Sequence, residues 1–270
     1  MFFIILLGII QGIAEFFPIS SSAHLIIFRD LFGLGKDVIS DNLSLSYDVA
    51  LHLGTAFAVV YIFFEDFLKL FLNGILTRSK TKEGKLFWCI MLSTMIAAIF
   101  GFIFEDYIEN YIRDKFILIA FSLLFVGIII YVIDKKSRKD KSLSEMTFKD
   151  ALIIGLCESF ALIPGFSRSG STIAIARLLR YDRVDACKYS FYLSLPIIVG
   201  AVFLEFIKSG FDIIISNITP FIIGIVASFI TGVLCIKCLL NYIQNNNFKL
   251  FMIYRIILGL IVIIYCIEIF

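Results

Sequence analysis

The sequence predicts an all-α polytopic membrane protein with about six transmembrane helices and an inverted-topology repeat built around two re-entrant helical hairpins. Of its 270 residues, 60% are hydrophobic and 30 are phenylalanine, and the mean hydropathy is +0.98. Soluble domains use only about 45–50% apolar residues. Six apolar runs are each near the ~20 residues that cross a bilayer. Two further apolar segments are broken by Pro, Gly and Ser, and these predict the hairpins.

The six predicted spans follow one another with only short loops between them, so we expect one membrane domain over residues 1–270. The spans cover residues 47–65, 87–104, 116–133, 189–207, 218–236 and 250–268. The net charge is only +2 and the charges fall in the loops. Such a chain has no basic patch typical of nucleic-acid binding, so we expect no nucleic-acid partner.

Loop charges predict the orientation of the chain. Loops 66–86 and 134–149 are rich in Lys and Arg, whereas loop 105–115 begins with Glu105, Asp106 and Glu109. By the positive-inside rule the two basic loops are cytoplasmic and the acidic loop is external. Two spans separate the basic loops, which therefore share a side.

Neither the N-terminus nor the cysteines suggest processing or metal chemistry. The run MFFIILLGII has no basic region or cleavage site and leads directly into a polar motif, so we expect no cleaved signal peptide. Cys235 and Cys238 have C-x-x-C spacing, but no second pair or histidine cluster accompanies them. We interpret them as small apolar side chains.

The two broken segments are residues 1–29 and 150–185. The second leaves a basic loop and returns to another basic stretch, so we expect it to enter and leave the membrane on the same side. Non-helical backbone at membrane depth is tolerated only where protein or water satisfies its polar groups. Both hairpins should therefore be buried and line a site.

A weak internal duplication relates these segments. An offset of 147 pairs Gly8 with Gly155, Gln11 with Glu158, Ser20 with Ser167 and Ser22 with Ser169. Three predicted spans lie between the copies, so the second copy starts from the opposite side of the membrane. We predict inverted repeats over about 1–133 and 150–270, joined by the cytoplasmic loop 134–149.

The first hairpin contains the motif EFFPISSSAH. Gln11 and Glu15 are four residues apart and share a helix face. After the proline the helix should restart with Ser20 or Ser21, three to four residues before His24, which puts serine and histidine on one face. Helix capping alone would also explain the serines, and a satisfied buried histidine would explain His24.

The second hairpin contains the motif PGFSRSGST. Arg168 stands between two serines, and Gly165 and Gly170 permit the left-handed backbone that turns N–H groups toward an anion. A helix should begin at about Ser171 and Thr172. Guanidinium, N–H groups and helix dipole together make a site for phosphate. Close helix packing is the other interpretation of the glycines.

Together the motifs hold the parts of a phosphoryl-transfer centre, namely a nucleophile, an acid or base, a cationic group and a seat for a divalent cation. Charges within a membrane are costly. We therefore interpret Glu15 and Arg168 as functional rather than as a structural ion pair, and we disfavour a purely structural bundle. His52, in DVALHLGT, is interpreted as a local hydrogen-bonding group.

The segments QGIAEFFPISSSAHL and ALIPGFSRSGSTI resemble the two signature motifs of the undecaprenyl-diphosphate phosphatases, the bacitracin-resistance family of bacterial membranes. Residues 47–63 and 191–201 extend the similarity over essentially the whole chain. The resemblance implies hydrolysis of undecaprenyl diphosphate to undecaprenyl phosphate and inorganic phosphate, which recycles the lipid carrier of peptidoglycan synthesis. It also implies dependence on Mg²⁺ or Ca²⁺ and a place in the bacterial plasma membrane. The expected partners are the lipid substrate, membrane lipids and a second copy of the chain in a homodimer.

The resemblance also assigns roles to individual residues. The catalytic set is Glu15, Ser21, His24 and Arg168. The phosphate-binding set is Ser20, Ser167, Arg168, Ser169, Gly170 and Thr172. The family's glutamate-rich stretch maps to Gln11 and Glu15; together with Glu158, the repeat partner of Gln11, they form the possible acid/base or metal-associated group, with Glu15 and Glu158 as expected metal ligands.

One position pair departs from the family pattern. Many members carry Glu at the position of Gln11 and Gln at that of Glu158. Because the two positions are partners in the predicted repeat, our hypothesis is that a carboxylate has exchanged repeats within one cavity.

Two questions stay open at this point. The nucleophile is His24, or Ser21 with His24 as its base, or a metal-bound water. The alternative function is a transporter or flippase of an anionic polyprenyl lipid, in which Arg168 binds without catalysing. Release of phosphate separates the two functions.

Overall fold

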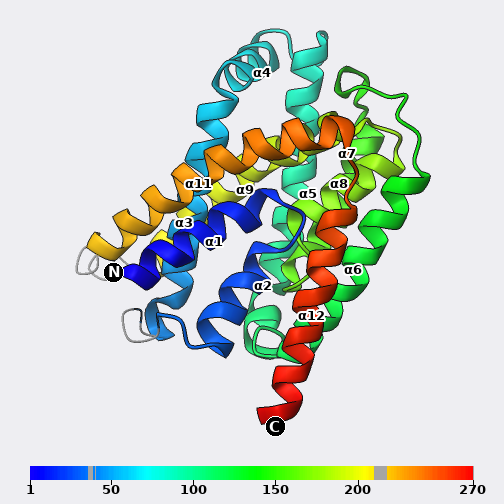
Figure 1. The fold of residues 1–270 in the computed structure, drawn as a ribbon. Coiled ribbons are helices and arrows are strands. Elements are labelled where there is room, and N and C mark those ends of the chain that lie inside the picture. Colours follow the sequence, from blue (N-terminus) through cyan, green and yellow to red (C-terminus); the bar gives the residue numbers. More distant parts are fainter. Residues whose placement is uncertain (36–38, 40, 210–217, 270) are drawn as a thin grey trace.

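The computed structural model describes the chain except for residues 36–38, 40, 210–217 and 270, and Figure 1 shows its arrangement. Within the described residues the fold is entirely helical, without a β-strand. The helices are α1 (Phe2–Phe16), α2 (Ser21–Leu25), α3 (Asp41–Ile62), α4 (Phe64–Leu76), α5 (Lys82–Tyr111), α6 (Phe116–Lys136), α7 (Phe148–Glu158), α8 (Arg168–Leu178), α9 (Arg183–Ser209), α11 (Ile218–Asn245) and α12 (Lys249–Ile269). A π-helical turn (Ile26–Leu31) continues α2, and 3₁₀ turns lie at Leu143–Glu145 and Ser159–Leu162.

Six of these helices are long and apolar enough to cross a membrane, which confirms the predicted polytopic all-α class. The spans are Leu43–Ile62, Lys82–Phe104, Phe116–Lys136, Arg183–Lys208, Ile218–Asn245 and Lys249–Glu268. Each overlaps one predicted apolar run. Their outward surfaces carry exposed Phe, Leu and Ile side chains, as expected of helices that face lipid.

Two predicted loops are partly helical. α4 occupies the first half of the predicted loop 66–86, and α5 continues to Tyr111 within the predicted loop 105–115. α4 has 13 residues, too few to cross the bilayer, and its apolar face is exposed. The Lys and Arg residues that follow α4 led to the prediction of a loop over 66–86, where the structure has a helix. The side chains of Glu105 and Glu109 lie outside the described residues.

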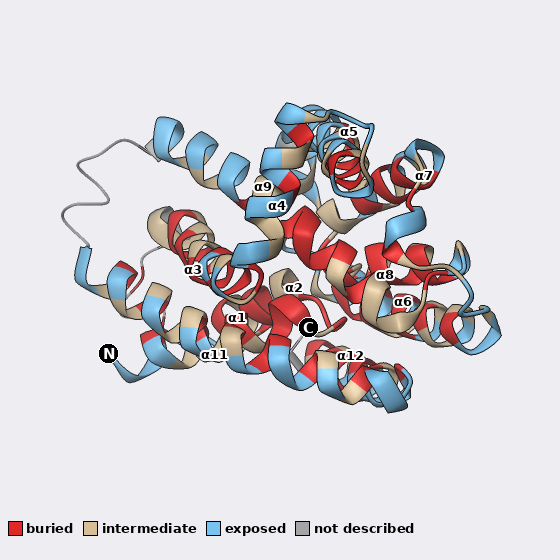
Figure 2. Ribbon diagram, turned by 90° about the horizontal axis from the view of Figure 1, so that it is seen from above, coloured by how far each residue is buried: buried red, intermediate tan, exposed pale blue. Residues whose placement is uncertain are grey.

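Both broken segments form helical hairpins with a turn in the middle. α1 and α2 make the first hairpin, and α7 and α8 make the second. α7 and α8 have 11 residues each, which at ~1.5 Å per residue is about half of a ~30 Å bilayer core. Figure 2 shows that α1, α2 and α8 contain the buried centre of the molecule, whereas α4 is mostly exposed.

The first helix of each hairpin packs along a spanning helix from the other half of the chain. α1 lies along α11, and α7 lies along α5. A Cβ on Gly8 would come within 2.7 Å of the Ala227 Cβ, and one on Gly155 within 2.8 Å of the Ser93 Cα. Both glycines permit the close backbone approach typical of membrane helices. The repeat boundaries stay a prediction.

A buried arginine ends the second half of each hairpin. Arg29 Nη1 lies 2.5 Å from Asp48 Oδ1, and Arg177 Nε lies 2.8 Å from Asp134 Oδ1. Both arginines are at most 2% exposed. These ion pairs anchor the hairpins to α3 and α6. In the connecting loop, the guanidinium of Arg180 hydrogen-bonds to the exposed Asp140 and holds the pKa of that carboxyl below its usual value.

Candidate active site

Each hairpin turn ends in a serine that caps the following helix. Ser20 and Ser167 have φ angles of +77° and +74°, a left-handed backbone that is uncommon outside glycine. The Ser20 Oγ accepts a bond from the N–H of Ala23 at 3.5 Å, and the Ser167 Oγ accepts one from the N–H of Gly170 at 3.0 Å. The predicted capping of the first helix restart is therefore present, and it recurs in the second hairpin.

The start of α8 differs from the sequence prediction. The helix begins at Arg168 rather than at about Ser171. Gly165 has the expected left-handed backbone, with φ +97°, but Gly170 is helical. A Cβ on Gly170 would come within 2.7 Å of the Ile130 side chain, so this glycine allows close packing. The serine hydroxyl at position 167 caps the helix three residues earlier than expected because Ser, like Asn and Asp, is a preferred N-cap.

Serines also join the two turns to each other. The Ser20 Oγ accepts a hydrogen bond from the N–H of Gly165 at 3.2 Å. The Ser169 Oγ donates one to the carbonyl of Phe17 at 3.2 Å. Two of the predicted phosphate ligands thus hold the turns side by side.

Glu15 is the centre of a polar cluster that draws on both hairpins. Its Oε1 accepts a bond from Arg168 Nη2 at 2.5 Å. Its Oε2 accepts bonds from Gln11 Nε2 at 2.9 Å and from Ser21 Oγ at 2.8 Å. The Glu15 side chain is only 4% exposed. The structure therefore brings together four of the predicted site residues.

His52 joins this cluster, which the sequence interpretation did not anticipate. Its Nδ1 makes the expected local bond, 2.7 Å from the carbonyl of Asp48. Its Nε2 lies 3.4 Å from Glu15 Oε2, and its side chain is 28% exposed. A histidine on a membrane helix one turn after an aspartate was the available signal.

Arg168 is fixed by contacts on its other side. Its Nη1 donates to the carbonyl of Ser190 on α9 at 2.9 Å. The Thr172 hydroxyl contacts the carbonyl of Arg168 at 2.8 Å and the Ser190 hydroxyl at 2.7 Å. Thr172 therefore holds the first turn of α8 against α9. The Arg168 side chain keeps 15% exposure, so the cluster has an open edge.

His24 lies outside the Glu15 cluster. Its Nδ1 is 2.7 Å from the carbonyl of Ser20, and its Nε2 is 2.7 Å from the Tyr254 hydroxyl. The Tyr254 ring stacks on the imidazole with centroids 5.5 Å apart. Ser21 is hydrogen-bonded to Glu15 and not to His24. Tyr254, on α12, carries no sequence signal beyond an aromatic residue in an apolar run.

Glu158 is buried without a hydrogen bond. It is 3% exposed, and neither carboxylate oxygen has a partner among the described residues; the same holds for Gln11 Oε1. The described part of the chain gathers no group of three or more His, Cys, Asp or Glu. Mg²⁺ needs fewer protein ligands, because it binds one or two carboxylates together with substrate phosphates and water. The unpartnered carboxylate of Glu158 fits such a cation.

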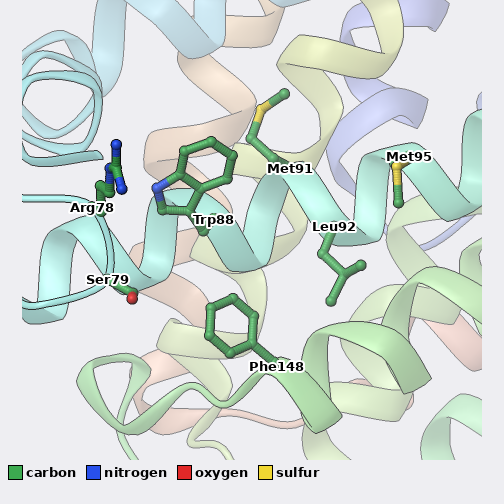
Figure 3. A pocket seen from close by; sticks show the side chains of 7 residues that line it. All are labelled: Arg78, Ser79, Trp88, Met91, Leu92, Met95 and Phe148. Carbon is green, nitrogen blue, oxygen red and sulfur yellow. The ribbon is translucent and has the colours of Figure 1, made fainter. Parts of the chain in front are cut away.

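A separate cavity of about 670 Å³ lies between the start of α5 and the start of α7 (Figure 3). Its lining is Arg78, Ser79, Trp88, Met91, Leu92, Met95 and Phe148. None of the predicted site residues lines it.

The fold and the cluster define a polytopic α-helical membrane protein with a carboxylate, a hydroxyl and a guanidinium gathered between two broken hairpins. The chain belongs to the family described as bacitracin resistance protein BacA, whose family model matches residues 4–261. This confirms the family resemblance found in the motifs.

Three relatives align with this chain over nearly their whole length. An undecaprenyl-diphosphatase of Caldicellulosiruptor bescii is 41% identical over 258 residues, covering 96% of this chain and 94% of that protein. One of Elusimicrobium minutum is 43% identical and covers 96% of both chains. One of Saccharophagus degradans is 37% identical and covers 94% of both.

Proposed function

We propose that this chain hydrolyses undecaprenyl diphosphate to undecaprenyl phosphate and inorganic phosphate, as a multi-pass enzyme of the bacterial membrane. Its family and the names of its relatives support this activity and the link to bacitracin resistance and cell-wall synthesis. The observation that carries the proposal is the contact of Ser21 and Arg168 with the two oxygens of Glu15. These are a nucleophile, a base and a phosphate-binding cation in one place.

The contacts favour Ser21 as the nucleophile and Glu15 as its base. The Ser21 Oγ would form a bond to the terminal phosphorus while its proton passes to Glu15 Oε2, 2.8 Å away. The bond from that phosphorus to the bridging oxygen breaks, and undecaprenyl phosphate leaves. Water then forms a bond to the phosphoserine phosphorus as the bond from phosphorus to Ser21 Oγ breaks, Glu15 returns its proton to that Oγ, and inorganic phosphate leaves with both protons of the water. Both nitrogens of His24 are already hydrogen-bonded elsewhere, so we assign it to positioning of the Ser20 turn.

Arg168 would bind the phosphoryl oxygens. In the free protein Nη2 is bonded to Glu15, and an incoming phosphate competes for the same N–H groups. A guanidinium binds phosphate through two parallel bonds, so Arg168 has to loosen its pair with Glu15 as substrate enters. This exchange also takes the guanidinium away from the Glu15 carboxylate, which favours transfer of the Ser21 proton to Oε2.

A divalent cation is a further proposal. Glu158, together with Glu15 once Arg168 has moved, would hold Mg²⁺ or Ca²⁺ against the substrate diphosphate. The cation would neutralise charge on the phosphates. Membrane lipids surround the spans, and a homodimer is proposed only as a partner state, to be tested by the mass of the purified protein in detergent.

The test is phosphate release from undecaprenyl diphosphate by purified protein in detergent, with and without EDTA. We expect metal-dependent release by the wild type and none by Arg168→Ala or Ser21→Ala. A phosphoenzyme trapped by rapid acid quench should carry phosphoserine, which survives acid, rather than acid-labile phosphohistidine. No release by folded wild type, with lipid bound through Arg168, would support the transporter instead.

A further inference from the structure

Arg255 is a fully buried arginine in the first third of α12, with 0% exposure. The other two fully buried or nearly buried arginines, Arg29 and Arg177, pair with aspartates. Across the residues that the structure describes, Arg255 has no such carboxylate, and the four hydrogen bonds that it donates go to backbone carbonyls. A buried charge is costly unless it is hydrogen-bonded. The role of Arg255 therefore depends on the segments to which these carbonyls belong.

Four carbonyls from three segments accept bonds from this guanidinium. On α6, Nε donates to Leu123 at 3.0 Å and Nη2 to Ser122 at 3.3 Å. In the hairpin turns, Nη1 donates to Pro18 at 3.1 Å and Nη2 to Gly165 at 2.6 Å. Pro18 and Gly165 are partners at the offset of 147. One side chain thus hydrogen-bonds to the carbonyls at equivalent positions of the two turns.

The chemistry of the turns explains why arginine is needed. A broken helix leaves carbonyls without helical partners, and at membrane depth other protein groups must satisfy them. Guanidinium presents five N–H donors in a fixed planar fork, whereas an ammonium presents three. Gly127 makes room for the stem, because a Cβ there would come within 3.1 Å of the Arg255 Cβ.

We propose that Arg255 is a positioning residue that keeps the two hairpin turns in register while Arg168 exchanges Glu15 for phosphate. The inference rests on the proposed function. The bond between Arg168 and Glu15 links the hairpins in the free protein, but it has to loosen when substrate binds. The bonds of Arg255 go to carbonyls that take no part in the reaction, so they persist through it.

Register matters because the reacting groups lie close to the two braced carbonyls. Ser21 follows Pro18 by three residues, and Arg168 follows Gly165 by three. A misplacement of about 1 Å between reacting groups can cost about 100-fold in rate. We therefore expect loss of the brace to lower kcat far more than it changes KM.

The experiment compares wild type, Arg255→Gln, Arg255→Lys and Gly127→Ala in detergent, with undecaprenyl diphosphate as substrate. We expect Arg255→Gln to lower kcat about 100-fold with KM changed less than about threefold. Hydrogen–deuterium exchange should rise in both turn peptides, residues 17–23 and 163–170, and stay unchanged in the spans. Arg255→Lys should recover part of kcat. Gly127→Ala, which pushes on the Arg255 stem, should shift kcat and exchange in the same direction by less.

Gly259→Ala is the matched control at the same pair of helices. The atoms nearest to a Cβ there belong to Ala120 and Leu124, at 2.9 Å from the Ala120 carbonyl oxygen and 2.9 Å from the Leu124 Cγ, rather than to Arg255. We expect it to lower Tm but to leave kcat and hydrogen–deuterium exchange at the turns unchanged.

The proposal is overturned if Arg255→Gln keeps kcat within about twofold of the wild type. It is also overturned if Gly259→Ala lowers kcat as much as Arg255→Gln does when both variants lose the same Tm. If Arg255→Gln does not fold, Gly127→Ala decides by the same criteria. Absence of phosphate release by wild type would refute the phosphatase, and exchange at the two turns would still decide the brace.

Discussion

The two hairpins share a backbone frame and differ in the chemistry placed on it. In both, a left-handed serine caps the second helix, and a buried arginine paired with aspartate ends it. The first hairpin carries Ser21 and Glu15, the proposed nucleophile and base, whereas the second carries the guanidinium of Arg168. The same backbone arrangement is therefore used twice, once in each hairpin. The proposed site is formed by joining the different side chains that the two hairpins carry.

The contrast is sharpest between the two buried carboxylates. Glu15 hydrogen-bonds to Gln11, Ser21 and Arg168 and lies near His52. Glu158 is equally buried and has no partner within the described residues. Unpartnered buried polar groups are rare in native proteins and point to an unseen water or ion. We therefore interpret Glu15 as preorganised for the chemistry and Glu158 as kept for a ligand.

The largest effect should come from Glu15→Gln. The amide keeps the shape of the side chain but removes the base for Ser21 and the charge that orients Arg168. General-base catalysis contributes about 10²–10⁴-fold, so we expect kcat for phosphate release to fall about 1,000-fold. Unchanged Tm would show that the fold is intact. A loss of less than about tenfold would remove Glu15 from the catalytic role.

Glu158→Gln tests whether the carboxylates act as one site. If a carboxylate has exchanged repeats, this variant should lose as much activity as Glu15→Gln, at physiological Mg²⁺. Because Glu158 is assigned to the cation alone, added Mg²⁺ should restore part of the rate of Glu158→Gln, whereas it should not restore Glu15→Gln, which also loses the base for Ser21. Titration of Mg²⁺ after EDTA treatment measures both. Near-normal turnover of Glu158→Gln without added cation would contradict the exchange.

The anchors of the two hairpins allow a test of stability rather than chemistry. Arg177→Gln leaves Asp134 buried and 1% exposed, with Arg183 as its remaining partner. Removing one partner of a buried pair costs about 3–5 kcal/mol. We expect a clear fall in Tm, softened by Arg183, with kcat of the remaining folded protein unchanged. A fall in kcat without loss of Tm would mean that the anchor tunes the site directly.

Much of the fold could be predicted because hydropathy dominates at membrane depth. The six spans and both broken segments follow from apolar runs and their interruption. α4 was missed because a 13-residue apolar helix is shorter than a span and leads into a basic stretch. Nothing in the fold tests the repeat boundaries, which stay a prediction.

The site was predicted in its residues better than in its contacts. Motif spacing identified Glu15, Ser21 and Arg168, which the structure brings together. Spacing along the chain also suggested that His24 serves Ser21, yet its imidazole turns to Tyr254 on a helix more than 200 residues away. Arg255 was the missed signal, since a lone arginine within an apolar run indicates function by its cost.

The smallest effect, and the finest test of the comparison, is Ser20→Ala against Ser167→Ala. Each loses a helix cap, worth about 1 kcal/mol, and each puts alanine at the same left-handed φ, so that strain cancels between them. Ser20 additionally accepts the N–H of Gly165 at 3.2 Å. Ser167 has no equivalent bond, because the partner of Gly165 is Pro18, which lacks an N–H. An N–H left without an acceptor costs about 1–3 kcal/mol.

We therefore expect Ser20→Ala to lower the free energy of unfolding in detergent by more than Ser167→Ala does, with exposed Ser144→Ala as the neutral control. Equal losses would show that the bond from Gly165 to Ser20 contributes nothing and that Arg255, the cluster around Glu15 and the bond from Ser169 to Phe17 hold the hairpins together.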